Sequence, residues 1–202
     1  MNNNYDDILE LLHNKDAEFG SIGNAMNAAQ TFIHSIQKVC KAIQITGRLR
    51  LLEPADHYIL EIIAATKLYK NVLGEQTADL EHSQVHQFLL ANPKKFKNLV
   101  YEDGKYFFIF KDYNFIVHHV WNVNELTVAQ ILNTGPANFI VWLRNTLPWG
   151  WTINDYQLID NDKMLVKNLS SEKAFFQSIG FNYILPSDRV NENRDYWMGF
   201  KV

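Results

Sequence analysis

Apolar residues recur at helical spacing near the start of the chain. Between residues 22 and 43 they follow one another at intervals of three, one and three, which places them on one stripe of a helix. The stripe spans about three heptads, close to the minimum length for a coiled coil. Its members are Ile22, Ala25, Met26, Ala29, Phe32, Ile33, Ile36, Val39, Cys40 and Ile43. A shorter helix is expected over residues 5–13.

An amphipathic helix needs an apolar partner. That partner is either the rest of the chain or another molecule, namely a protein partner or a second copy, and the spacing leaves both open. In the second case the contact is expected through Ile22, Ala29, Phe32, Ile36 and Ile43. We expect residues 1–46 to form a helical extension and residues 47–202 to form a domain.

The pattern changes after Gly47. The sequence predicts a strand over residues 48–52 and then a helix over residues 54–68. Pro54 suits the first turn of a helix, and the negative charge of Asp56 is stabilised near the positive end of the helix dipole.

Several short strands follow a second helix, expected over residues 82–91. The Asp103-Gly104 pair is a hairpin turn signal between two of them. Their connections are too short for crossovers, so adjacent strands are expected to be antiparallel. The chain is therefore predicted to be an α/β protein with a mixed, largely antiparallel sheet flanked by helices. These strands are expected at residues 98–102, 106–110, 115–122, 126–132 and 163–167, with a further helix at 136–147.

The last thirty residues predict a helix followed by two strands. The helix covers residues 170–180 and is stopped by Gly180, because glycine adopts a left-handed conformation without steric cost. Phe175 and Ile179 fall on its apolar face, while Glu172 is expected in solvent. The strands are expected over residues 181–185 and 196–202.

Composition narrows the class of protein. The chain of 202 residues is 47% hydrophobic and 20% charged, which is ordinary for a soluble globular protein. Its net charge of −3 gives no broad positive field, so we expect no nucleic-acid binding. No membrane binding is expected either. Cys40 is the only cysteine, and no apolar run is long enough to span a membrane. The amino terminus lacks the features of a signal peptide, so a cytoplasmic protein is expected.

The carboxy-terminal pattern resembles the GNAT superfamily, the acetyl-CoA-dependent N-acetyltransferases. The residues that carry the resemblance are Asn168, Ala174, Phe176, Gly180 and Phe181. A second match is the segment 47–58, which looks like the first strand and the first helix of that fold. The resemblance implies a GNAT-like sheet over residues 47–202 with an amino-terminal helical extension.

The resemblance also implies where acetyl-CoA would bind. Family members hold the pyrophosphate on backbone amides at a strand-to-helix junction, and LNTGPA at residues 132–137 has that placement. Leu132 stands where glutamine or arginine is usual, and Pro136 has no N–H to donate. The junction therefore looks degenerate, and as a proline-initiated helix start it needs no ligand. The implied cofactor-binding residues are Asn133, Thr134, Gly135, Ala137 and Asn168.

Catalytic residues for acetyl transfer are also incomplete. The family's late-helix tyrosine is Phe176 in this chain, and a phenyl ring has no proton to give. Candidates for a general base are Glu125, His118 and His119, of which only one histidine can face a given cleft because neighbouring strand residues alternate. The candidate catalytic set is Glu125 and His119, with Tyr196 as a substitute acid.

No metal site is predicted. His82 and His86 lie four residues apart and can share a helix face, but without a third ligand a solvated face is the expected role. Phosphate-binding loops of the Walker type and the Gly-x-Ser-x-Gly motif of hydrolases do not occur in the sequence.

Two functions follow from the resemblance. We favour a structural or interaction protein with a degenerate cofactor loop, because residues 168–202 also resemble the GNAT-like internal or accessory virion proteins of tailed phages. Such a protein would be located in the virion. The alternative is an acetyl-CoA-dependent N-acetyltransferase acting on an amine of a small molecule or a protein.

Overall fold

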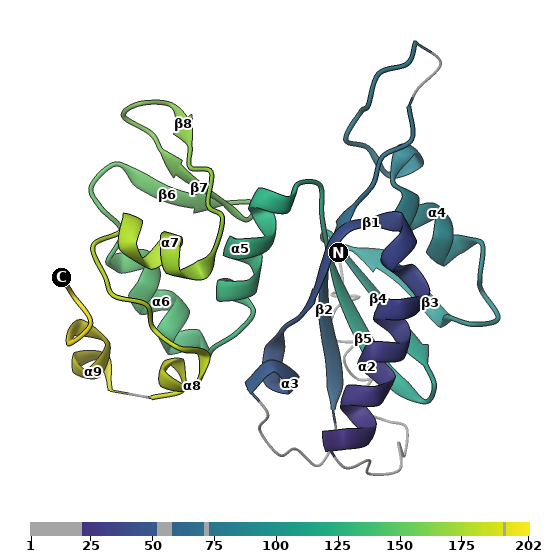
Figure 1. The fold of residues 1–202 in the computed structure, drawn as a ribbon, viewed down its shortest axis with the longest axis horizontal. Coiled ribbons are helices and arrows are strands. Elements are labelled where there is room, and N and C mark those ends of the chain that lie inside the picture. Colours follow the sequence, from purple (N-terminus) through teal and green to yellow (C-terminus); the bar gives the residue numbers. More distant parts are fainter. Residues whose placement is uncertain (1–21, 52–57, 71–72, 192) are drawn as a thin grey trace, which may run out of the picture.

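The computed structural model describes residues 22–51, 58–70, 73–191 and 193–202. Its amino-terminal part, residues 22–120, is built on a five-stranded sheet with the order β1-β2-β5-β4-β3 and is called the sheet unit below (Figure 1). Strands β2 and β5 are parallel, and the other neighbours are antiparallel. The strands are β1 (Cys40–Ile45), β2 (Ile59–Thr66), β3 (Lys97–Glu102), β4 (Lys105–Phe110) and β5 (Tyr113–Val120).

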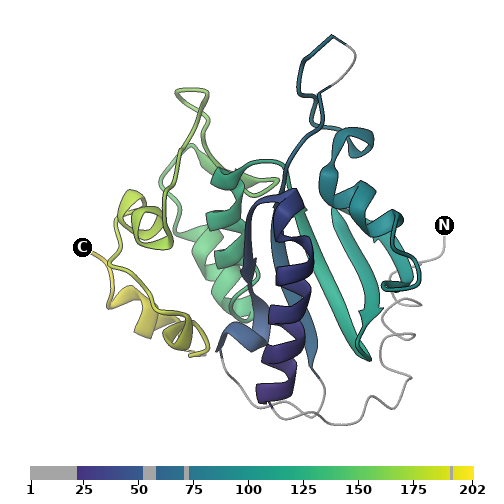
Figure 2. The ribbon, with the colours of Figure 1, turned by 45° about the vertical axis from the view of Figure 1, so that its right-hand side comes forward.

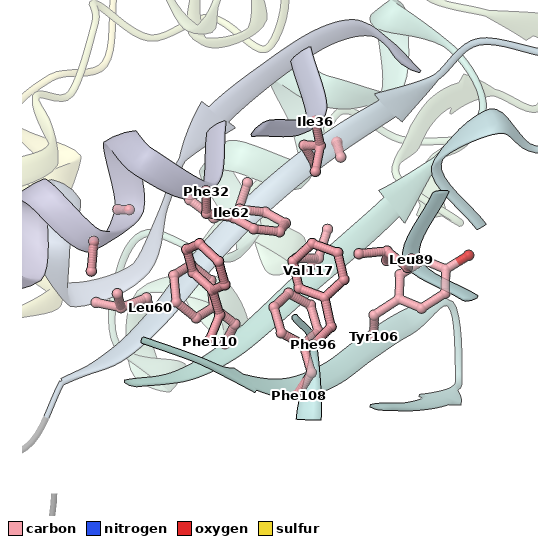
Figure 3. Packing of buried hydrophobic residues seen from close by; sticks show 14 of the residues in the cluster. Phe32, Ile36, Leu60, Ile62, Leu89, Phe96, Tyr106, Phe108, Phe110 and Val117 are labelled. Atoms are coloured by element: carbon pink, nitrogen blue, oxygen red, sulfur yellow. The ribbon is translucent and has the colours of Figure 1, made fainter. Parts of the chain in front are cut away.

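Helix α2 (Ile22–Ile36) packs on one face of this sheet, beside α4 (Gln84–Leu90). Phe32 of α2 is fully buried, and its ring centroid lies 5.0 Å from that of Phe115 and 5.3 Å from that of Phe108 (Figure 3). Burial of one phenylalanine contributes about 1.5–3 kcal/mol. The apolar partner of the amino-terminal stripe is therefore the chain's own sheet.

This packing decides between the two partners that the spacing left open, and the docking surface and the coiled coil are wrong. Ala29, Phe32 and Ile36 are at most 1% exposed, and Ile22 and Ile43 pack against the same core, so this stripe is not a free surface. The helix ends at Ile36 and is followed by a 3-10 turn over Gln37–Val39 and by strand β1. Because β1 pairs with β2, residues 40–45 belong to the same sheet as the rest of the unit. The division after residue 46 stays a prediction about domains, and the helix expected over residues 5–13 lies outside the described residues.

The segment after β1 differs from its prediction. Gly47–Leu51 forms the short helix α3 instead of a strand, and Ile59–Thr66 forms strand β2 instead of a helix. β2 lies between two neighbours and is covered on both faces, so its sequence is almost continuously apolar and lacks the alternation that marks a half-exposed strand.

The predicted hairpin and the strands around it are confirmed. β3, β4 and β5 lie within two residues of the expected bounds, and Asp103 and Gly104 join β3 to β4 with positive φ angles of 47° and 75°. Helix α4 is also confirmed, and it follows a 3-10 turn over Leu80–His82.

Residues 123–202 form a second unit beside the sheet unit, called the C-terminal unit (Figures 1 and 2). Its core is aromatic and contains Phe139, Trp142 and Trp197. A small antiparallel sheet with the order β6-β7-β8 covers one side. The elements are α5 (Val123–Leu132), α6 (Ala137–Asn145), β6 (Trp151–Asn154), β7 (Gln157–Asp160), β8 (Leu165–Val166), α7 (Glu172–Ser178), α8 (Pro186–Arg189) and α9 (Arg194–Met198).

The carboxy-terminal predictions are confirmed for the helix and wrong for the strands. Helix α7 ends before Gly180, which has a φ of 84°, as expected. The two final strands are reduced to one isolated bridge between Phe181 and Lys201, and α8 and α9 occupy the remainder. Residues 126–132 lie in α5 and are also not a strand. The α/β class is confirmed, but the ending on which the acetyltransferase resemblance depended is absent.

Helix α5 joins the two units, because it packs on the face of the sheet opposite to α2. Leu126 and Ala129 of α5 form a small core with Ile63, Ala65 and Val120 of the sheet. None of the helices in the described part of the chain has the length and apolar character that crossing a membrane requires.

Candidate functional site

A cavity of about 360 Å³ opens where the sheet unit meets the C-terminal unit. We call it the cleft. One wall comes from α3 and β2, and the other from the α5–α6 junction and the residue after α8. Its lining residues are Gly47, Arg48, Leu51, Glu61, Asn133, Gly135, Pro136 and Val190.

Two glycine residues, Gly47 and Gly135, line the cleft. The N–H of Gly47 donates to the carbonyl of Asn133 at 2.9 Å, so the turn after β1 is tied to the α5–α6 junction. Gly47 has a φ of 63°, and a Cβ placed there would lie 2.6 Å from Oε1 of Glu61. Gly135 has a φ of 146°, and a Cβ there would lie 3.1 Å from the ring of Phe139. Both positions favour glycine, because other residues would be strained at these positive φ angles. At Gly47 an added Cβ would also collide with the Glu61 side chain, whereas at Gly135 it would make a tight contact with Phe139.

Arg48 is the basic residue of the cleft lining. Its side chain is exposed, and among the described residues none accepts a hydrogen bond from its guanidinium. A guanidinium has five N–H donors in a planar fork, which matches the oxygens of a phosphate or carboxylate.

A buried ion network lies behind the cleft and connects the two units. Arg50 donates two hydrogen bonds of 2.8 and 2.7 Å to the carboxylate of Glu172, and Arg189 donates two of 3.2 and 3.0 Å to the same group. Arg50 also donates to Thr134, whose hydroxyl pairs with that of Thr46 at 2.9 Å. The network therefore joins α3 to the α5–α6 junction, to α7 and to α8.

The charge of Glu172 is strongly stabilised. Burial alone would raise the pKa of this carboxyl, but the hydrogen bonds and positive charges of Arg50 and Arg189 outweigh burial and lower the pKa to about 2. The sequence prediction that Glu172 faces solvent is wrong, since the residue is 7% exposed. No local pattern identifies this role, because its two partners lie 122 and 17 residues away in the sequence.

A second polar chain crosses from the sheet to the small antiparallel sheet. Oε2 of Glu61 lies 3.2 Å from Nε2 of His118, and Nδ1 of the same ring lies 3.2 Å from the hydroxyl of Tyr156. A neutral imidazole satisfies both contacts by donating to the carboxylate through Nε2 and accepting from the phenol through Nδ1. His118 is only 2% exposed, so both of its nitrogens are engaged within the protein.

The predicted catalytic residues do not come together. Glu125 is buried in the capping box of α5 and accepts hydrogen bonds from the backbone of Trp121 and the amide of Gln157. His119 points to the opposite face of the sheet from His118, as strand alternation requires, and its Nε2 lies 2.9 Å from the hydroxyl of Ser83.

None of the three predicted catalytic residues lines the cleft. Burial, with a smaller contribution from the charge of His86, lowers the pKa of His119 to about 4, so this ring is neutral at pH 7. Tyr196 lies in α9 and donates to Asp188. Glu125, His119 and Tyr196 are therefore placed in three separate parts of the molecule.

Some of the residues predicted to bind a cofactor lie at the cleft, and their role in binding stays a prediction. Asn133 and Gly135 line the cleft, Thr134 lies in the ion network, and Ala137 begins α6 beside them. Asn168 is exposed in the segment between β8 and α7. The segment singled out in the sequence thus contributes to one wall of the cleft, and the sequence analysis gave no site role to the other wall, which carries Arg48 and Glu61.

Comparisons with known proteins identify the fold. Residues 129–190, from α5 to the residue after α8, match the DNA polymerase beta thumb family. This chain is similar to a structure of Leishmania infantum polymerase beta, a ternary P/T complex, with a TM-score of 0.68 and 14% sequence identity. The superposition covers 92% of this chain and 80% of the polymerase chain. The chain has a polymerase-β-like fold. A ternary gap complex of the same polymerase is also similar, with a TM-score of 0.64 and 14% sequence identity. That superposition covers 84% of this chain and 70% of the polymerase chain. Among curated proteins, no sequence matches the chain.

The polymerase-β-like fold corrects four expectations from the sequence. The GNAT resemblance is wrong, and with it the acetyltransferase and the phage virion interpretations. The expectation of no nucleic-acid binding conflicts with likeness to a DNA polymerase. Acetyl-CoA binding stays an untested prediction, but the family resemblance that suggested it is gone.

The net charge of the chain is a poor predictor of nucleic-acid binding, and the reason is physical. A charge sum over 202 residues describes the field far from the molecule, whereas at physiological salt a bound phosphate responds to charges within about 8 Å. A molecule with a net charge of −3 can therefore present a local cationic site such as Arg48.

Proposed function

We propose that this protein binds DNA together with a nucleoside triphosphate, and that the triphosphate occupies the cleft. The observation that carries the proposal is the Arg48 guanidinium, which lines the cavity and has no partner among the described residues. The cavity volume of about 360 Å³ lies within the range of small-molecule sites, about 300–1,000 Å³.

The opposite wall supports the same ligand chemistry. Helix α6 begins at the cleft, and the first N–H groups of a helix together with its dipole favour an anion. Pro136 at its N-cap lacks an N–H, so the donors come from the residues that follow. Arg48 and the start of α6 thus bring two sources of positive potential to one cavity.

The polymerase-β-like fold supports DNA as the second ligand. The similar structures are ternary complexes of a DNA polymerase, named as P/T and gap complexes. In this chain the two units are held together by the Arg50–Glu172–Arg189 network, which fixes the walls of the cleft relative to one another.

Binding of fluorescent nucleotide and of labelled gapped DNA, followed by anisotropy, tests the proposal. Both ligands are expected to saturate, and DNA affinity is expected to fall as salt rises, because phosphate contacts release counterions. Loss of a charged hydrogen bond costs about 1.5–3 kcal/mol, so R48A is expected to weaken nucleotide binding about 10- to 100-fold.

The matched control is K163A. It removes one exposed positive charge from the segment between β7 and β8, away from the cleft lining, and Lys167 continues to pair with Asp160 at 3.4 Å. Nucleotide affinity is expected to be unchanged in this variant. Absence of saturable binding to either ligand, or equal losses in R48A and K163A, contradicts the proposal.

A further inference from the structure

We infer that the cleft holds nucleotide and DNA without joining them, so that this chain is a non-polymerising member of its fold. The inference rests on the proposed function. It depends on the side chains that the sheet presents to the cleft, and on their ability to hold metal ions.

Polymerases transfer nucleotides with two metal ions about 3.5–4 Å apart, which clamp the attacking and the leaving oxygens. Magnesium prefers oxygen ligands and is held by carboxylates together with substrate phosphates. A chain that catalyses this reaction therefore needs several carboxylates close together at the sheet.

The strands beside the cleft supply one carboxylate. On the face of β2 that includes Glu61, the residue two positions earlier is Ile59. The residue directly opposite Glu61 on the parallel strand β5 is Ile116. An isoleucine side chain has no lone pair to offer a metal, and in the described ranges no three His, Cys, Asp or Glu side chains are grouped so that they could hold an ion.

The single carboxylate is also partly engaged. Oε2 of Glu61 contacts His118, and Oε1 lies against Gly47, where a Cβ would come within 2.6 Å. His118 cannot replace the missing ligands, because its second nitrogen contacts Tyr156. These residues do not fit a two-metal centre, whereas Arg48 fits a phosphate without one. Among the described residues, the cleft therefore has a group that can bind a phosphate and lacks the several carboxylates that nucleotide transfer requires.

Primer extension and binding on the same preparation separate the two claims. The chain is incubated with labelled gapped DNA, all four deoxynucleotides and either Mg²⁺ or Mn²⁺, beside a mock purification from cells that lack the gene. We expect saturable binding of DNA and nucleotide and no incorporation above the mock. Incorporation above the mock overturns the inference but leaves the proposed function standing, whereas failure to bind either ligand overturns the proposed function.

Metal affinity gives a readout that is independent of activity. Binding of Mn²⁺ to the free protein, measured by electron paramagnetic resonance, is expected to be weak in the wild type and to tighten at least tenfold in I59D/I116D, which places two carboxylates beside Glu61. The control I59N/I116N adds polar groups of the same size without charge and is expected to bind as the wild type does. Two tight Mn²⁺ sites in the wild type overturn the inference. If I59D/I116D does not fold, the wild-type titration and the extension assay still decide.

Discussion

Glu61 and Glu172 lie near the same cleft and have opposite roles. Glu172 is buried and receives four hydrogen bonds from two guanidinium groups. Glu61 lines the cavity, its side chain is 28% exposed, and its polar partner is one imidazole. The first carboxylate holds the two units together, and the second faces the space that a ligand would occupy.

The number of hydrogen-bond partners distinguishes a carboxylate that stabilises the fold from one that can interact with a ligand. A carboxylate whose lone pairs are filled by arginines stabilises the fold only as long as both partners remain, because each buried charge needs compensation. A carboxylate with one weak partner and access to solvent is free to respond to a ligand. The largest effects of mutation are therefore expected at Glu172.

The strongest test of this contrast is E172A. Removal of the carboxylate leaves Arg189, which is 0% exposed, as an uncompensated buried charge, and such losses cost about 3–5 kcal/mol. Urea denaturation measures the change. The triple hydrophobic replacement R50M/E172M/R189M removes all three charged groups together, and it is expected to lose less stability than E172A. A cost under about 1 kcal/mol for E172A would mean that the network does not hold the units together.

Acid titration tests the same network without mutation. The pKa of Glu172 is about 2 in the folded chain and about 4.5 when unperturbed, so the unfolded state takes up the proton first as pH falls. The stabilisation is present above pH 4.5 and is lost as pH falls toward 2, with a magnitude on the order of 3 kcal/mol. Denaturation midpoints across this range, compared with those of E172Q, isolate the contribution. Parallel curves for the two proteins would contradict it.

Titration of His119 is expected to change the stability of the fold at a higher pH than titration of Glu172. Its pKa is about 4 in the folded chain against 6.5 when unperturbed, so stability is expected to fall as pH drops from 6.5 toward 4. H119F keeps an aromatic ring in place and is expected to lack this slope. NMR titration of the ring resonances measures the pKa directly, and a value near 6.5 would contradict the prediction.

A glycine substitution sharpens the position of Glu61. G47A introduces a Cβ at positive φ and within 2.6 Å of the Glu61 carboxylate, and a cost of about 1–3 kcal/mol is expected from the two effects together. G104A is the matched control, because Gly104 also has a positive φ but nothing within 4 Å of the added Cβ. In an E61A background the cost of G47A should approach that of G104A. An unchanged cost would show that Glu61 does not lie against Gly47.

The smallest effect is expected for Y156F. This variant removes one hydroxyl from the Glu61–His118–Tyr156 chain, and a neutral hydrogen bond contributes about 0.5–1.5 kcal/mol. Differential scanning calorimetry is sensitive to a change of this size. A cost comparable to that of E172A would reverse the ranking of the two carboxylates.

Short-range signals in the sequence determined much of the local structure. The Asp103-Gly104 hairpin, the strands around it and the stop of α7 at Gly180 follow from backbone preferences within a few residues. The junction at residues 132–137 was singled out through the family resemblance instead, and although it forms one wall of the cleft, its role in holding an anion stays a prediction.

Tertiary structure decided what these signals left ambiguous. Strand β2 was predicted as a helix, because a strand covered on both faces has an apolar run without alternation, and its pairing with β1 and β5 selects the extended form. Helix spacing beyond Ile36 was overridden in the same way when residues 40–45 paired with β2.

The assembly of the site could not be read from the sequence. Glu172 gave the pattern of a solvated helix residue, and only folding brings Arg50 and Arg189 to it from other elements. Likewise, no local pattern marks Glu61, His118 and Tyr156 as partners, because their contacts form only where the sheet packs against the C-terminal unit. Local sequence sets backbone conformation because its forces act between neighbours, whereas charge pairing and cleft geometry depend on residues that only the completed fold makes adjacent.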